Sequence, residues 1–254
     1  MNERYPVLDG AESFYYEGNE VGILITHGFL GTPQSVRFLG ESFARLGYTV
    51  FAPRLKGHGT HYKDIEITSH EDWFAEAEKG YQFLKDRCKS VYAAGQSMGG
   101  ALTLWLANKY PEIAGIVLIN AALRIPGYEY LKGKTYPRYI DEGAPDIKKV
   151  DVEEITYGKV PVPSIFELQK IMERTPFLLP SIKTPVLGFK SIEDHVVPAE
   201  CTDFILEKIG SAKKKAISLY NSYHVASMDH DKEKIVSITH QYIQENQAGS
   251  LSFV

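Results

Sequence analysis

The sequence has few cysteines, no long hydrophobic run and no large excess of charge of one sign. Cys88 and Cys201 stand far apart and outside any CxxC or Cys/His spacing, which argues against a zinc site or a disulfide scaffold. No stretch approaches the roughly 18 apolar residues of a membrane span, and the first residues lack the basic start and apolar run of a signal peptide. We therefore expect a cytoplasmic protein with reduced cysteines.

Charges of both signs are mixed along the chain, with 28 basic and 32 acidic side chains and a formal charge of -4. The only basic cluster, Lys213-Lys214-Lys215, precedes an apolar stretch, so a solvated loop entering a strand explains it better than a phosphate-binding patch. This distribution predicts no binding of nucleic acid. The 254 residues, of which 44% are hydrophobic, predict a single domain over 1–254 with one insertion.

Short apolar runs rich in β-branched residues alternate with amphipathic segments along most of the chain. This pattern is typical of strand and helix units in a mostly parallel central sheet flanked by helices, and so predicts an α/β fold. The predicted strands cover residues 22–26, 49–52, 91–94, 116–119, 186–189 and 216–219. The predicted helices cover about 34–46, 71–87, 98–109, 199–209 and 231–245.

The alternation breaks from about residue 122 to 183, where Pro, Gly and Tyr are frequent. Within this interval Ser164 and Glu167 have the spacing of a capping box and open a short helical patch over 164–172. A loop of this length in a compact domain usually has a function, so we predict an inserted cap or lid. Its apolar residues 177–179 are expected to pack on the core, with at most transient contact with a lipid surface.

The pentapeptide Gly95-Gln96-Ser97-Met98-Gly99 has the pattern Gly-x-Ser-x-Gly. Alone it is a weak signal, because a chain with this much glycine shows one by chance roughly one time in ten. Here it follows the predicted strand at 90–94 and opens a predicted helix, which is the setting of a nucleophile elbow. A helix-starting turn without catalytic function is the alternative. The context favours Ser97 as a nucleophile.

A serine nucleophile needs a base within hydrogen-bond reach and a third group that orients the base. On such elbows the chain order is Ser, then Asp or Glu, then His. Of the eight histidines, His224 fits best, because it follows the predicted strand at 216–219. Asp194, after the strand at 186–189, is the preferred acid and Glu193 the second choice. An acidic residue favoured near a helix start is the non-catalytic explanation of Asp194.

The tetrahedral intermediate of acyl transfer needs two backbone N–H donors. Met98, directly after the nucleophile, would supply one, and Phe29 in the loop after the strand at 22–26 would supply the other. His27 precedes the serine, so chain order gives it a structural role in bracing this loop. This chemistry requires no metal and no organic cofactor.

Several segments resemble the α/β-hydrolase superfamily, and within it the bacterial, Bacillus-type monoacylglycerol lipases and related carboxylesterases. The likeness runs nearly end to end, through residues 5–8, 27–29, 53–62, 95–100, 194–198 and 221–226. It implies an α/β-hydrolase fold with the triad Ser97, His224 and Asp194, and oxyanion donors Phe29 and Met98. It also implies a small cap over an apolar acyl channel and a narrow polar pocket for glycerol.

The resemblance extends to contacts with the substrate. Glu154 matches the place of a cap carboxylate that reads the glycerol end, although a solvated helix face explains its charge pattern equally well. Gly143 stands where a relative carries a bulky apolar residue, which would admit bulkier groups. Asn120 is also expected at the substrate. Gln96 replaces an apolar residue of the family motif, and we expect little effect from it.

These observations predict a serine hydrolase that cleaves monoacylglycerols to glycerol and fatty acid through an acyl-enzyme. The expected partner is a small ester molecule, and a homodimer is compatible with the sequence. One alternative is a carboxylesterase of broader or aromatic small-ester preference. An alternative of another class is a hydrolase-fold ligand-binding protein without turnover, but such a role gives no reason to keep five catalytic positions together.

Overall fold

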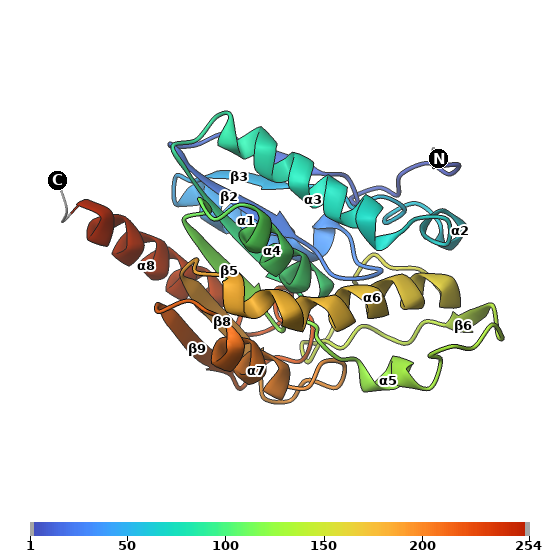
Figure 1. Ribbon diagram of the computed structural model, residues 1–254. Helices are drawn as coiled ribbons and strands as arrows, with labels where there is room; N and C mark the ends of the chain where they lie inside the picture. Colours follow the sequence, from blue (N-terminus) through green and yellow to red (C-terminus); the bar gives the residue numbers. More distant parts are fainter. Residues whose placement is uncertain (1–2, 252–254) are drawn as a thin grey trace.

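The computed structural model describes residues 3–251 of the chain. Its centre is a seven-stranded sheet in the order β1-β3-β2-β4-β5-β8-β9 (Figure 1). Neighbouring strands are parallel except for β1, which pairs antiparallel with β3. The strands are β1 (Phe14–Tyr16), β2 (Val21–Thr26), β3 (Thr49–Ala52), β4 (Ser90–Gln96), β5 (Gly115–Ile119), β8 (Val186–Ser191) and β9 (Lys214–Leu219). The predicted α/β fold with a mostly parallel sheet is confirmed.

Helices cover both faces of this sheet, so two separate apolar clusters form (Figure 1). One cluster packs the sheet against the two helices α1 (Pro33–Arg45) and α8 (Lys232–Leu251). In α1, Val36, Leu39 and Phe43 are fully buried, which is the spacing of one helix face. The other cluster involves α3 (His70–Lys85), α4 (Met98–Lys109) and α7 (Glu200–Lys208).

The six predicted strands and five predicted helices are all present, and most ends agree within two residues. The exception is α8, which continues to residue 251 rather than 245. Two short elements outside the inserted segment were not predicted: β1, a strand of three residues, and α2 (Tyr62–Ile65), a single helical turn. Elements this short carry too little periodicity to be recognised.

The segment between β5 and β8 forms a layer of its own beside the sheet (Figure 1). It contains the short helix α5 (Pro126–Glu129), a two-stranded antiparallel sheet of β6 (Tyr139–Asp141) and β7 (Lys159–Pro161), and the long helix α6 (Val162–Leu178). Helix α6 docks on α4, where the indole N–H of Trp105 donates to the Thr175 hydroxyl at 2.9 Å. A 3-10 turn, Leu179–Ser181, leads into β8.

The capping box predicted in this segment is wrong. Helix α6 begins at Val162 with proline in its first turn, where the missing N–H costs nothing. The Ser164 hydroxyl donates instead to the carbonyl of Ile65 at 3.1 Å, and the Glu167 carboxylate binds the ring and the backbone N–H of His70. Both polar side chains therefore join α6 to the α2–α3 region rather than capping their own helix.

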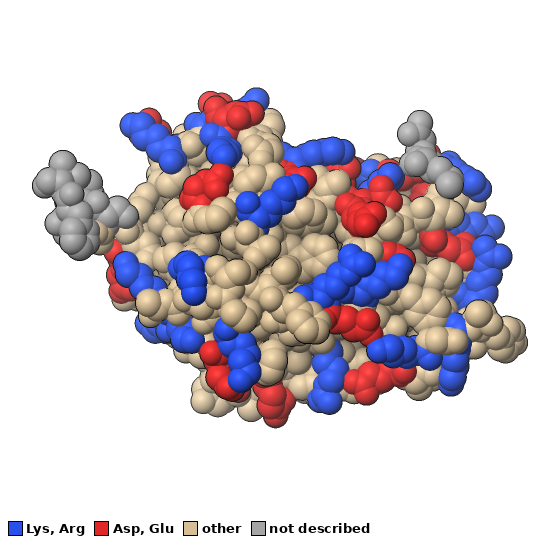
Figure 2. Space-filling view, in the orientation of Figure 1, with Lys and Arg blue, Asp and Glu red and all other residues tan. Residues whose placement is uncertain are grey.

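Surface properties agree with the mixed charge pattern of the sequence. The face seen in Figure 2 carries basic and acidic side chains side by side, with no extended patch of one sign. Cys88 and Cys201 are both free. Of the helices in the described part of the chain, none is long and apolar enough to cross a membrane. Of the apolar residues expected to pack on the core, Leu179 is buried whereas Phe177 is 85% exposed.

Candidate active site

Ser97 lies at the sharp turn between β4 and α4, in the middle of the sheet. Its backbone has φ 56° and ψ -120°, a region that non-glycine residues rarely adopt. The Ser97 N–H donates to the carbonyl of Ile119 on β5 at 2.9 Å, which helps to hold this conformation. Strained residues of this kind concentrate at functional sites.

The glycines that flank Ser97 are required by close backbone contacts. A Cβ atom on Gly99 would lie 2.2 Å from the carbonyl oxygen of Thr26 on β2. A Cβ atom on Gly95 would lie 2.1 Å from the carbonyl oxygen of Gly99. No side chain fits at either position, because both distances are far inside van der Waals contact. The motif is therefore a steric consequence of packing α4 tightly against β2 and β4.

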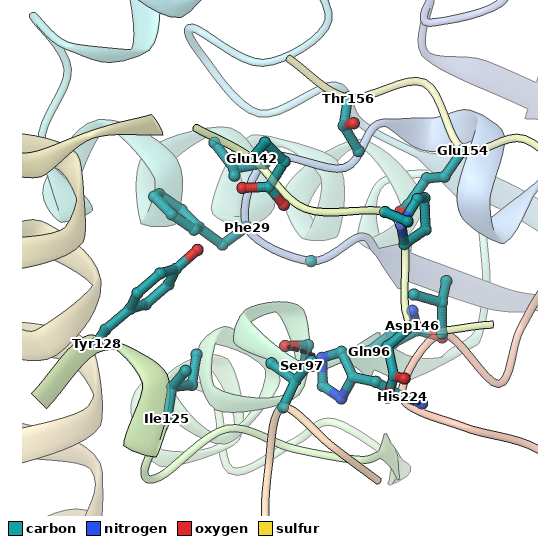
Figure 3. Close-up of a pocket in the computed structure, with 16 residues that line it drawn as sticks. Phe29, Gln96, Ser97, Ile125, Tyr128, Glu142, Asp146, Glu154, Thr156 and His224 are labelled. Atoms are coloured by element: carbon teal, nitrogen blue, oxygen red, sulfur yellow. Dashed lines mark hydrogen bonds between the residues drawn. The ribbon is translucent and has the colours of Figure 1, made fainter. Parts of the chain in front are cut away.

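A hydrogen-bonded chain connects Ser97 to two loops at the carboxyl ends of β8 and β9. His224 Nε2 lies 2.9 Å from Ser97 Oγ (Figure 3), and His224 Nδ1 lies 2.8 Å from Asp194 Oδ2. The other Asp194 oxygen accepts from the N–H groups of Val196 and Val197 at 2.9 and 2.7 Å. With Nδ1–H donating to the carboxylate, Nε2 is free to accept the serine proton.

The rejected candidates lie elsewhere. Glu193, the second choice for the acid, is on the surface and pairs with Lys148 at 2.7 Å. His195 turns away from Asp194 and binds Asp146, with its Nδ1 2.7 Å from Oδ1. The structure therefore brings Asp194, and not its neighbours, to the ring of His224.

The loop after β2 lies directly against the nucleophile. A Cβ atom built on Gly28 would be 3.4 Å from the Ser97 Cβ. Within residues 3–251 the Phe29 N–H donates to no other protein group, and Met98 is the first residue of α4, where a backbone N–H has no acceptor within its own helix, so both are available to an oxyanion. His27 braces this loop, because its Nδ1 donates to the Gly28 carbonyl at 2.9 Å and its Nε2 accepts from the Leu55 N–H at 3.2 Å.

Burial lowers the pKa of His27 to about 4, so its ring is neutral at physiological pH. Burial likewise holds the pKa of its neighbour His58 well below the usual range, and the His27 ring adds to this effect. The two rings meet edge to face with centroids 5.2 Å apart. A neutral ring suits the structural role that chain order predicts for His27.

A cavity of about 100 Å³ opens in front of Ser97 (Figure 3). Apolar and aromatic residues cover part of its wall, among them Phe29, Leu30, Ile125, Tyr128, Val196 and Val225. Polar residues cover the rest, among them Gln96, Glu142, Asp146, Glu154 and Thr156. The segment between β5 and β8 supplies Tyr128 from α5 and both glutamates from its loops.

The two glutamates in this wall have unusual titration behaviour. Burial raises the pKa of Glu154 to about 7, although His224 and a hydrogen bond with Ser35 oppose the shift. Burial also raises the pKa of Glu142 to about 7, and the charge of Glu154 adds to the effect. No Lys or Arg is present among the described residues of the wall to offset them. In the part of the chain that the structure describes, no three His, Cys, Asp or Glu side chains gather as metal ligands would.

Of the three residues expected to contact substrate, only Glu154 lines the cavity. Gly143 is exposed, and a Cβ atom there would meet no atom within 4 Å, while its neighbours Glu142 and Ala144 line the wall. This corrects the expectation that position 143 is a wall residue. A substitution at Gly143 would extend into open space rather than narrow the cavity.

Asn120 was also expected at the substrate, but its side chain contacts protein groups and not the cavity. Its Oδ1 accepts from the Ser191 N–H at 2.7 Å, and its Nδ2 donates to the His224 carbonyl at 2.8 Å. Its backbone has φ 47°, a conformation that Asn tolerates better than most residues. Asn120 therefore ties the ends of β5 and β8 to the histidine loop.

Sequence reasoning missed three contributors to the site. Gln96 Oε1 accepts from the N–H of Ser227 at 3.1 Å and so links the elbow to the histidine loop. Asp146 Oδ2 accepts from the His224 N–H at 3.1 Å and lines the cavity. Glu142 was also missed. Gln96 and Asp146 bind residues that are distant along the chain. Only the position of Gln96 inside the Gly-x-Ser-x-Gly motif could have indicated from the sequence that it belongs to the site.

The fold and this site define an α/β-hydrolase with a serine nucleophile elbow. The sequence profile of the Hydrolase_4 family, described as serine aminopeptidase, S33, matches residues 19–231. The chain belongs to this family.

Two curated proteins and a solved structure are similar to this chain over most of its length. The chain is 50% identical over 238 residues to a thermostable monoacylglycerol lipase of Bacillus sp. (strain H-257), covering 93% of this chain and 95% of that one. It is 27% identical to a carboxylesterase of Bacillus subtilis (strain 168), covering 91% and 96%. A solved structure described under the metagenome-derived lipolytic enzymes LipS and LipT has a TM-score of 0.91 at 44% identity, covering 94% and 100%.

Proposed function

We propose that this protein hydrolyses monoacylglycerols to glycerol and fatty acid through an acyl-enzyme. The observation that carries the proposal is the hydrogen-bonded chain from Ser97 through His224 to Asp194, which opens on a cavity with an apolar and an acidic side. The 50% identity to a monoacylglycerol lipase over most of both chains supports the same substrate class.

In the first half of the reaction, Ser97 Oγ attacks the ester carbonyl while His224 Nε2 takes its proton. Asp194 stabilises the resulting imidazolium through the hydrogen bond from Nδ1. The N–H groups of Phe29 and Met98 bind the oxyanion that develops on the carbonyl oxygen. Neither donor needs to break a bond to another group of the described protein to do so.

In the second half, the ester bond breaks and glycerol leaves with the proton that His224 held. A water molecule then gives a proton to His224 Nε2 and attacks the acyl-serine carbonyl. Collapse of this second intermediate releases the fatty acid and returns the proton to Ser97 Oγ. Oxygen and protons balance over the two halves, with one water consumed for each ester bond.

The segment over about 122–183 acts as the cap in this proposal. Its apolar residue Ile125 lines both the cavity and a surface groove that Leu123 and Met172 also line, and in this proposal the acyl chain extends toward that groove. Glu154 lies on the acidic side, where its carboxylate would accept hydrogen bonds from glycerol hydroxyls. The two ends of the substrate would therefore meet chemically different walls.

Replacement of Ser97 by Ala tests the proposal. Turnover of 1-monolauroylglycerol should fall by about 10⁴-fold or more, with unchanged circular dichroism, because the attacking oxygen is lost. Comparison with methyl laurate separates the alternatives. Faster turnover of the methyl ester would favour a broad carboxylesterase, and ligand binding without turnover of either ester would favour a non-catalytic protein.

A cytoplasmic location, at most transient contact with lipid surfaces and the formation of a homodimer remain predictions within this proposal. Cell fractionation, sedimentation with vesicles and light scattering of the purified protein test them in turn. Phe177, which is 85% exposed on the cap helix α6, is the position to change in the vesicle assay.

A further inference from the structure

The acidic side of the cavity has more negative charge than neighbouring protein groups balance. Three of the lining residues are acidic, Glu142, Asp146 and Glu154, and in the described chain none of the lining residues is Lys or Arg. The Asp146 carboxylate already forms hydrogen bonds with the ring of His195 and the backbone N–H of His224. Glu154 interacts with Ser35, whereas no protein hydrogen bond or ion pair engages the Glu142 side chain within residues 3–251.

These carboxylates lie near the histidine that would protonate the leaving alcohol. His224 acts on Glu154 electrostatically, and Glu154 acts on Glu142, so the three groups are neighbours. His224 Nε2 is the atom that would protonate the departing alcohol oxygen. In Figure 3 the side chains of Glu142 and Glu154 project into the cavity from the cap, across from Ser97 and His224.

Aromatic rings adjoin the same region. Phe29 and Tyr128 both line the cavity and meet edge to face, with ring centroids 6.4 Å apart. Burial raises the pKa of the Tyr128 phenol, and the charge of Glu142 contributes, which places the ring close to that carboxylate. Aromatic faces beside carboxylates are the combination that binds quaternary ammonium groups, through cation–π attraction and direct charge pairing.

We propose that the enzyme also hydrolyses esters whose alcohol carries an ammonium group, and that Glu142 and Glu154 form the anionic subsite for that group. The inference rests on the proposed function, because the same Ser97 performs the reaction. The alcohol leaves with the proton from His224, and water then releases the acid, as for a glycerol ester. A cation placed here would relieve the repulsion between the two carboxylates, whereas an anionic alcohol would increase it.

A pair of substrates that differ only in charge tests the proposal. Butyrylcholine carries a quaternary nitrogen, and 3,3-dimethylbutyl butyrate has a carbon atom in its place with the same shape. The ratio of kcat/KM for the cationic ester to that for the neutral ester should be about 10 at pH 8 and low salt. This ratio should decrease toward 1 in 0.5 M NaCl, because salt screens the attraction. A wild-type ratio of 1 or below would overturn the proposal.

Variants that keep the side-chain shape but remove the charge show which residues cause the preference for the cationic ester. Glu142→Gln should reduce the ratio about 5-fold, and the double variant with Glu154→Gln should bring it to about 1. Asp141→Asn removes the same charge from the neighbouring exposed position outside the cavity, so its ratio should match the wild type. An equal ratio in wild type and Glu142→Gln would contradict the assignment to Glu142. Inhibition of wild-type turnover by choline more strongly than by 3,3-dimethylbutanol gives the same test without a variant.

Turnover of 1-monobutyrylglycerol separates this inference from the proposed function. If that ester and the neutral butyrate are both hydrolysed but the cationic ester is not preferred, only the ammonium subsite is wrong. If none of the three esters is hydrolysed, the proposed function itself fails.

Discussion

The polar side chains on the sheet loops behind the cavity and the glutamates in the cap wall differ in how they are held. On the sheet side, Asp194 accepts two backbone N–H bonds and one bond from His224, and Asn120 ties the ends of β5 and β8 to the histidine loop. On the cap side, Glu142 has no such protein partner in the described chain and Glu154 interacts mainly with Ser35. Fixed groups suit the bond-breaking steps, whereas unsatisfied groups are available to select the alcohol.

The largest effect should come from the sheet side. Asp194→Asn presents an amide in place of a carboxylate, so His224 loses the partner that fixes its tautomer, and kcat should fall about 10³- to 10⁴-fold. Glu193→Gln is the matched control, since it removes the adjacent acid that pairs only with Lys148, and its kcat should stay within about 2-fold of the wild type. Similar losses in both variants would mean that the acid has been misassigned.

A change on the cap side should be smaller and should depend on the substrate. At pH 8, where Glu154 is mostly ionised, Glu154→Gln should lower kcat/KM for 1-monolauroylglycerol by about 10- to 100-fold, because the glycerol hydroxyls lose a charged acceptor. The same variant should lower kcat/KM for methyl laurate by less than about 3-fold. Glu153→Gln, one residue away on the exposed face, serves as the control. Equal losses for both esters would remove the distinction between the two walls.

Gln96 connects the elbow to the histidine loop, so its replacement should affect stability and rate together. Gln96→Leu leaves the Ser227 N–H without its acceptor inside the protein and should lower the free energy of unfolding by about 1–2 kcal/mol. We also expect a loss of a few-fold in kcat with little change in KM. Urea unfolding and steady-state kinetics measure both, with the exposed Gln241→Leu as control. Unchanged stability would show that this hydrogen bond is dispensable.

The smallest expected effect is a change in the free energy of unfolding, which the buried charge of Glu142 lowers. The pKa of Glu142 is about 7 in the folded protein, above the value near 4.5 expected for the unfolded chain, so ionisation destabilises the fold as pH rises between these values. Glu142→Gln does not ionise and should be more stable than wild type by about 1 kcal/mol at pH 8, with a much smaller difference at pH 5. An equal difference at both pH values in urea unfolding would contradict the raised pKa.

The same contrast explains what could be predicted from the sequence. Ser97, Asp194 and His224 each follow a strand at the carboxyl edge of a parallel sheet, so recognising the strands and their order places all three near one another. The six strands and five helices were recognisable because each has a clear apolar period. The flanking glycines added a local steric signal.

The cap did not follow from the same rules. Its contacts pair Glu167 with His70 and Ser164 with Ile65, residues about a hundred positions apart, so the local spacing of Ser164 and Glu167 suggested a capping box that does not form. Gly143 and Asn120 do not line the cavity, because which side of a loop faces a cavity depends on tertiary packing. Glu142 belongs to no recognisable sequence motif. Only the structure, in which it is buried near Glu154, shows that it lines the cavity.

Covalent labelling tests the central claim, that Ser97 is a nucleophile activated by His224, most directly. Incubation with a fluorophosphonate, followed by digestion and mass spectrometry, should give one adduct, on the peptide that contains Ser97. Labelling should be at least about 100-fold slower in a folded His224→Ala variant and absent after heat denaturation. An adduct on a different residue, or equal labelling rates in wild type and His224→Ala, would contradict the account.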